Sequence, residues 1–125
     1  MDWRDQVIGN VGRSMGMDDL NFSGSGVIKL TFERGGDLFI EAKDSGVLFY
    51  QTRMISRHDC LETLLVALKS CHYSQSMKHP LQVGLQGEEG LVLCSFLANE
   101  SFSEPNIQGL MQMMGEQFDK ITAAS

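Results

Sequence analysis

Two of the three cysteines and two of the three histidines of this 125-residue chain lie in one stretch, RHDCLETLLVALKSCHY. Thiols and imidazoles are the side chains that bind zinc or act as nucleophile and base. The hydrophobic spacing of the stretch predicts a helix. At a rise of about 1.5 Å per residue, Cys60 and Cys71 lie roughly 16 Å apart along the axis, and His58 and His72 roughly 21 Å. Neither pair can bind one metal ion.

The consecutive residues His58, Asp59 and Cys60 contain the groups of a catalytic triad. Neighbouring helix positions point in different directions, whereas known triads are assembled from residues distant in sequence. The glycines of GSG and ERGGD match no phosphate-binding loop and are typical of turns. We therefore expect no catalytic site, no metal and no cofactor. A small cysteine-dependent enzyme that uses Cys60 or Cys94 is the alternative from another class.

The same stretch has the pattern of an amphipathic packing helix. Six apolar residues fill an arc of about 160° at 100° per residue, and we expect this arc to pack on a sheet: Leu61, Leu64, Leu65, Ala67, Leu68 and Cys71. Buried free cysteines behave as small hydrophobes. Val66 and Tyr73 lie together on the otherwise polar side, so they are candidates for a contact with a partner.

The whole chain reads as one α+β domain, residues 1–125, in the order helix, three-strand antiparallel meander, helix, two-strand hairpin, helix. Helical periodicity and capping residues predict the helices, and alternation between turn residues predicts the strands. The expected helices are 2–16, 56–73 and a last one from Ser103, and the expected strands are 27–33, 38–43, 47–54, 81–86 and 91–97.

Two predicted sheet segments carry apolar residues on both faces. In the last strand Leu91, Leu93 and Leu97 line one face, while Val92, Cys94 and Phe96 make the other face apolar as well. Such a strand is either covered on both sides or part of a subunit contact. In the first strands we expect five residues to face the core: Ile28, Leu30, Phe32, Leu38 and Ile40. This leaves three apolar residues on the outer face: Val27, Phe39 and Phe49.

Composition narrows the class of protein. Hydrophobic residues make up 42% and charged residues 21%, as in folded globular domains, and the formal net charge is −6. The ten Lys and Arg residues are scattered, so no basic face is available to bind nucleic acid. The N-terminus has no signal-peptide pattern, and the longest aliphatic run, LLVAL, is too short for a membrane span. We expect a cytoplasmic protein.

The element order, size and acidity resemble the class I type III secretion chaperones of Gram-negative bacteria. The resemblance runs from the Trp3-led first helix through SRHDCLETLLVAL and PLQVGLQGEEGLVL to the closing helix from Ser103. Within this family the chain is most similar to the small subunits that chaperone a secreted gatekeeper. A regulatory protein-interaction module of the same fold is a further alternative.

The resemblance implies a homodimer, or a heterodimer with a second small chaperone, formed through the second helix and adjoining strands. The residues expected in that interface are Val66, Tyr73, Val92, Cys94 and Phe96.

The resemblance also implies a cargo. In this family the N-terminal segment of a secreted gatekeeper or effector wraps the dimer in extended form, and no ATP site is required. The residues expected to receive its apolar side chains are Trp3, Val27, Phe39 and Phe49.

Overall fold

The computed structural model describes residues 3–18, 20–22, 25–32, 36–55, 60–73, 81–87 and 90–124, without the side chains of 60, 70–73 and 122–124. The elements are α1 (Trp3–Ser14), β1 (Val27–Phe32), β2 (Gly36–Ala42), β3 (Gly46–Met54), α2 (Cys60–Tyr73), β4 (Gln82–Gln86), β5 (Gly90–Ala98), the short 3-10 helix η2 (Asn99–Ser101) and α3 (Glu104–Ala124). This order confirms the predicted α+β class.

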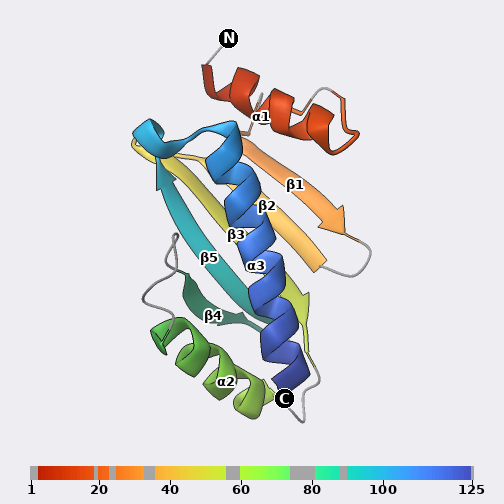
Figure 1. Ribbon diagram of the computed structural model, residues 1–125, viewed down its shortest axis with the longest axis vertical. Coiled ribbons are helices and arrows are strands. Elements are labelled where there is room, and N and C mark those ends of the chain that lie inside the picture. The colour runs from red at the N-terminus through yellow and green to blue at the C-terminus, as the bar shows by residue number, and fades with distance from the viewer. Residues whose placement is uncertain are drawn as a thin grey trace.

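The five strands form one antiparallel sheet in the order β1-β2-β3-β5-β4 (Figure 1). β5 pairs with β3 along the full length of both strands, from Gly46↔Ala98 to Met54↔Gly90. β4 is therefore an edge strand, and β1 is the other edge. The predicted meander and the predicted hairpin thus join in a single sheet, with α2 in the connection between them.

The start of β2 requires a glycine. Gly36 has a φ of +77°, and a Cβ placed there would overlap the carbonyl oxygen of Thr52. Only glycine adopts this conformation without steric cost. β2 therefore starts at a glycine of the ERGGD segment, two residues before the expected strand 38–43.

The core lies between one face of the sheet and the helices α1 and α3. In Figure 1, α3 runs along that face and α1 lies across the upper end of the sheet. The helical periodicity predicted for α3 is confirmed, because five of its residues are fully buried: Ile107, Leu110, Met114, Phe118 and Ile121. Ile8 and Val11 contribute from α1. The Phe102 ring joins the layers, with centroids 6.3 Å from Phe22 and 6.4 Å from Phe49.

Polar contacts fix α1 against the turns of the sheet. Arg4 Nη1 donates to the carbonyl oxygen of Lys43 at 2.6 Å, and Asp5 Oδ1 accepts from the Phe22 amide at 2.8 Å. Asn10 Nδ2 donates to Glu104 Oε2 at 3.2 Å at the start of α3. These bonds join the two core helices to each other and to the β2–β3 connection.

The prediction that Phe49 points outward is wrong. Phe49 is completely buried and lies directly opposite Ile40 of β2, which is also completely buried. Directly opposite residues in an antiparallel pair share a face of the sheet. The core side of β3 is therefore formed by Val47, Phe49 and Gln51, and a one-residue difference in register exchanges the two faces.

Candidate functional site

The outer face of the sheet is the face opposite the core. It consists of alternate residues, each half-buried or exposed: Val27, Lys29, Thr31, Phe39, Glu41, Leu48, Tyr50, Thr52, Val92, Cys94 and Phe96. The strand register aligns Lys29, Phe39, Tyr50, Cys94 and Gln82 in one row across all five strands. The row places apolar and aromatic side chains at the centre of this face.

An aromatic pair occupies the middle of the row. The rings of Phe39 and Tyr50 are stacked, with centroids 5.0 Å apart and planes 12° apart. Lys29 Nζ lies 5.9 Å from the centroid of the Phe39 ring, close enough for a cation–π attraction. The pair provides a flat, rigid and partly exposed surface of the kind that commonly carries binding energy.

A shallow hollow of about 200 Å³ lies further along the outer face, over β3, β5 and β4. It is lined by Leu48, Gln82, Cys94, Ser95 and Phe96, and Phe96 is nearly half exposed. The Cys94 Sγ lies 3.8 Å from Gln82 Oε1, and burial raises the pKa of the Cys94 thiol. A raised pKa lowers the fraction of thiolate, which is the nucleophilic form of cysteine.

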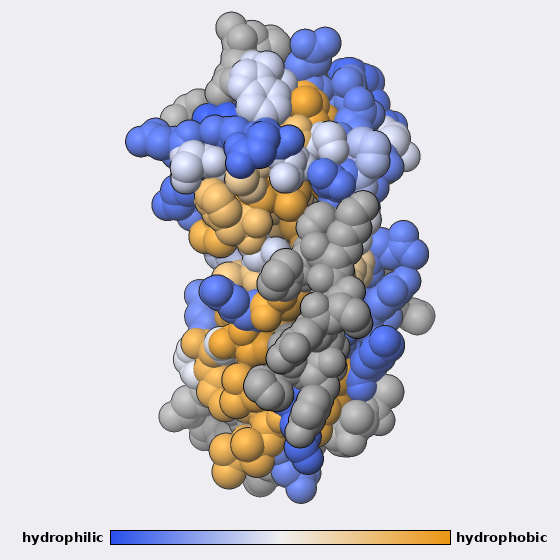
Figure 2. All heavy atoms as spheres, turned by 60° about the vertical axis from the view of Figure 1, so that its left-hand side comes forward, coloured by the Kyte–Doolittle hydropathy of each residue, from blue (hydrophilic) through white to orange (hydrophobic). Residues whose placement is uncertain are grey.

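A second apolar surface, the leucine stripe, lies on α2. Leu61, Leu65 and Leu68 are 69%, 56% and 47% exposed, and Leu85 of the neighbouring strand β4 is 43% exposed. In Figure 2 hydrophobic side chains extend over much of the height of the molecule, down to the lower end, where Figure 1 shows α2 and β4. Exposed apolar surface of this extent is typical of an interface between proteins.

The leucine stripe corrects two sequence predictions. The face of α2 that is buried carries Thr63 and Ala67, because α2 packs against β4 and α3 at the end of the sheet and does not lie flat on it. Leu61, Leu65 and Leu68, expected in the core, are consequently exposed. Leu64 is half-buried and packs against the core, and Ala67 is buried as expected. Val66, expected on a free surface, is half-buried and packs against the core.

The structure brings some predicted site residues together and separates others. Val27, Phe39, Val92, Cys94 and Phe96 share the outer face, although the sequence assigns them to two different functions. Trp3 is half exposed but lies on α1, with its ring 5.9 Å from Phe102 in an edge-to-face arrangement.

Other predictions concern parts of the chain that the structure does not describe. His58 lies outside the described residues, as do the side chains of Cys60, Cys71, His72 and Tyr73. Within the described ranges, no three His, Cys, Asp or Glu side chains come together as metal ligands would. None of the helices in those ranges is long and apolar enough to cross a membrane.

Sequence reasoning missed the leucine stripe and two residues of the outer face, Leu48 and Tyr50. Leu48 and Tyr50 flank Phe49 in β3, so placing Phe49 in the core would have placed both of them on the outer face. The signal for the stripe was the width of the apolar arc of α2, which exceeds what one contact face can bury.

A small antiparallel α+β domain with two exposed apolar surfaces has the architecture of a protein that binds other polypeptides. The chain matches the family model described as type III secretory system chaperone SycN over residues 3–120. It belongs to this family and is a type III secretion chaperone. No curated protein sequence matches the chain.

Solved structures show the same fold at low sequence identity. A chain of the heterodimeric ExoU–SpcU complex from the Pseudomonas aeruginosa type III secretion system is 18% identical, with a TM-score of 0.68 and coverage of 91% of this chain and 93% of that one. A chain in the structure of the Yersinia pestis secretion chaperone SycH with a fragment of YscM2 is 12% identical, with a TM-score of 0.68. The match covers 98% of this chain and 99% of that one. YbjN from E. coli, described as a candidate transcription regulator, is 16% identical, with a TM-score of 0.60. The match covers 93% of this chain and 86% of that one.

Proposed function

We propose that the protein is one subunit of a dimeric chaperone in the bacterial cytoplasm. Its cargo is the N-terminal segment of a secreted gatekeeper or effector, held in extended form and kept competent for secretion. The observation that carries this proposal is the simultaneous exposure of the leucine stripe on α2 and the apolar outer face of the sheet. One surface serves the second subunit, and the other serves the cargo.

The leucine stripe suits the subunit contact. Leu61, Leu65 and Leu68 follow helical spacing on α2, which packs against the edge strand β4, and Leu85 of that strand is exposed as well. Apolar helix faces of this kind are buried in dimers. The partner is a second copy or another small chaperone.

The outer face suits an extended cargo. An unfolded segment has free backbone donors and acceptors and can pair with an unpaired sheet edge, while its alternate side chains enter apolar patches. The edges are β1 and β4, and the stacked pair Phe39 and Tyr50 lies between them. The chaperone acts by stoichiometric binding, without catalysis. A gatekeeper of the YopN type is the expected cargo.

Co-expression tests this function. The chain is produced with a small chaperone and a gatekeeper encoded beside it, and the complex is analysed by size exclusion with light scattering. We expect a stable complex in which the bound N-terminal segment of the cargo is protected from protease. A wild-type chain that stays monomeric and retains no secreted protein would contradict the proposal.

A substitution at Phe39 locates the cargo on the outer face. Truncation of an aromatic anchor commonly costs about 1 to 4 kcal/mol of binding, so Phe39→Ala should weaken cargo retention on the order of ten- to a thousandfold. Phe39→Leu preserves apolar area and is the matched control. If Phe39→Ala lowers the melting temperature in proportion to the loss of binding, Phe39 is important for folding and the cargo lies elsewhere.

A further inference from the structure

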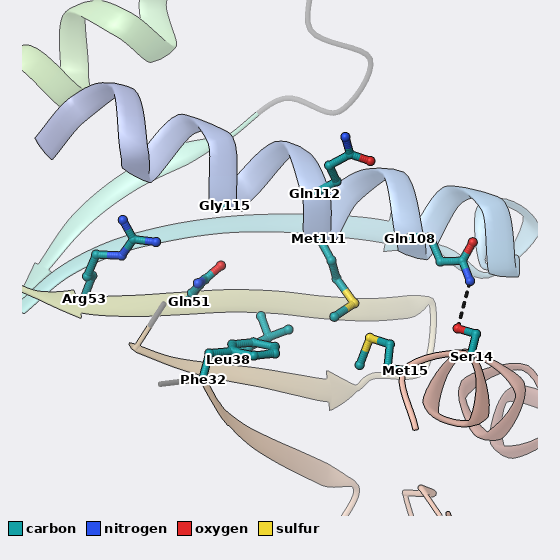
Figure 3. A pocket seen from close by; sticks show the side chains of 10 residues that line it. All are labelled: Ser14, Met15, Phe32, Leu38, Gln51, Arg53, Gln108, Met111, Gln112 and Gly115. Carbon is teal, nitrogen blue, oxygen red and sulfur yellow. Dashed lines mark hydrogen bonds between the residues drawn. The ribbon is translucent and has the colours of Figure 1, made fainter. Parts of the chain in front are cut away.

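A cleft of about 440 Å³ opens on the core side of the sheet, away from both the outer face and the leucine stripe. Figure 3 shows it between α3, the end of α1 and the strands β1 to β3. Its apolar lining consists of Met15, Phe32, Leu38 and Met111. Its volume is within the range of roughly 300–1,000 Å³ that is usual for ligand pockets.

One of the described residues that line the cleft is charged: Arg53, near the end of β3. Its Nη1 donates to Asp119 Oδ1 at 3.0 Å, and its guanidinium carbon lies 4.7 Å from the centroid of the Phe118 ring. Within the described part of the chain, the buried Nε of Arg53 has no hydrogen-bond partner. Buried donors are nearly always paired in folded proteins, so this Nε is available to an acceptor that enters the cleft.

The walls of the cleft are suited to accommodating an added side chain. Met15 and Met111 have flexible, polarisable side chains that repack around varied apolar groups. Gly115 of α3 lines the opening, and a Cβ built there meets no atom within 4 Å. The site therefore combines free space, adaptable apolar walls and a positive charge with an unpaired donor.

We propose that this cleft binds one large apolar side chain of the secreted partner, with a nearby carboxylate of the same segment pairing with Arg53. The occupant follows from charge complementarity, because Arg53 is the only charged residue among the described residues that line the cleft. This inference rests on the proposed chaperone function and adds a recognition rule to it: a hydrophobic residue with Asp or Glu within a few positions. In an extended segment, residues two apart are on the same side.

The test uses a fluorescent eleven-residue peptide as the probe. It has a central leucine, a glutamate two positions to either side, and otherwise serine and glutamine. Titration into the chaperone is followed by anisotropy and by the methyl signals of ¹³C-labelled methionines. Signals of Met15 and Met111 should shift, while that of Met54, an exposed residue outside the cleft, should not. No binding up to millimolar peptide, or shifts elsewhere only, would overturn the proposal.

Two glycines of α3 provide a matched pair of variants. Gly115→Leu fills the cleft, whereas Gly109→Leu adds the same side chain on the same helix outside the lining. A Cβ is unobstructed at both positions, so both variants should fold. We expect Gly115→Leu to weaken peptide binding at least tenfold and Gly109→Leu to leave it within twofold. Equal binding by the two variants would refute the site.

The charge rule is tested separately. Arg53→Met should weaken binding of the peptide at least fivefold. A peptide with glutamine in place of both glutamates should show the same loss of affinity for the wild-type chaperone, but no further loss for Arg53→Met. Asp119→Asn removes the competing carboxylate, so it should preserve or strengthen binding. If glutamine peptides bind as well as glutamate peptides, the carboxylate requirement is wrong.

The co-expression readout separates this inference from the chaperone function. If the Gly115→Leu subunit binds no peptide but still captures the full-length secreted protein at wild-type level, the proposed role of the cleft in cargo recognition is refuted. The chaperone function itself is then unaffected. A wild-type subunit that captures no secreted protein refutes the function itself.

Discussion

Leu65→Glu is the most direct test of the subunit contact. Leu65 lies in the middle of the leucine stripe, between Leu61 and Leu68, and is more than half exposed. The substitution leaves the packed face of α2 untouched, because that face carries Thr63 and Ala67. We therefore expect a folded subunit that fails to associate.

The magnitude follows from the exposed fractions. Full burial of a leucine is worth about 2 kcal/mol, so each half-exposed leucine contributes about 1 kcal/mol and the stripe about 3 kcal/mol per subunit. Leu65→Glu loses the contribution of about 1 kcal/mol from Leu65. It also adds the cost of desolvating a carboxylate, which is several kcal/mol per buried ion. A total of at least about 3 kcal/mol corresponds to a dissociation constant raised at least about 100-fold.

Sedimentation over a range of concentrations, alone and with the second small chaperone, measures this constant. Leu65→Met retains apolar area and should associate like the wild type. The reasoning fails if Leu65→Glu keeps a dissociation constant within about threefold of the wild type while its circular dichroism is unchanged. It also fails if the wild type is monomeric with its partner present.

Three further predictions concern stability and reactivity. Phe49→Ala should destabilise the fold by about 3–5 kcal/mol, since the side chain is fully buried, and chemical denaturation would measure this; a loss below about 1 kcal/mol would contradict the core position. Gly36→Ala should cost at least about 2 kcal/mol because of the positive φ and the overlap with Thr52, and an unchanged melting temperature would show that β2 starts differently. Burial raises the pKa of the Cys94 thiol, so less of it is thiolate at a given pH than for a free cysteine. In a variant that keeps Cys94 as its single cysteine, the pH dependence of the alkylation rate should therefore shift to higher pH. Labelling as fast as that of a model thiol at pH 8 would contradict this.

The sequence by itself determined the elements and most of the core. Wherever apolar residues occupy only one face, the local pattern has a single solution. α3 buries Ile107, Leu110 and Met114, which recur at helical spacing, and β1 buries Ile28 and Leu30. The order of elements and their spacing were also sufficient to indicate the chaperone family, because they are properties of the chain and not of its packing.

Tertiary structure decided the orientation of elements that are apolar on more than one face. In β3, both sets of alternate residues contain apolar side chains, Val47 and Phe49 in one set and Leu48 and Tyr50 in the other, so only the register with β2 selects the core face. In α2, the apolar arc is wider than one contact, and the docking of the helix against β4 and α3 selects the small residues Thr63 and Ala67. Close approach favours small side chains at that contact, and this leaves Leu61, Leu65 and Leu68 exposed.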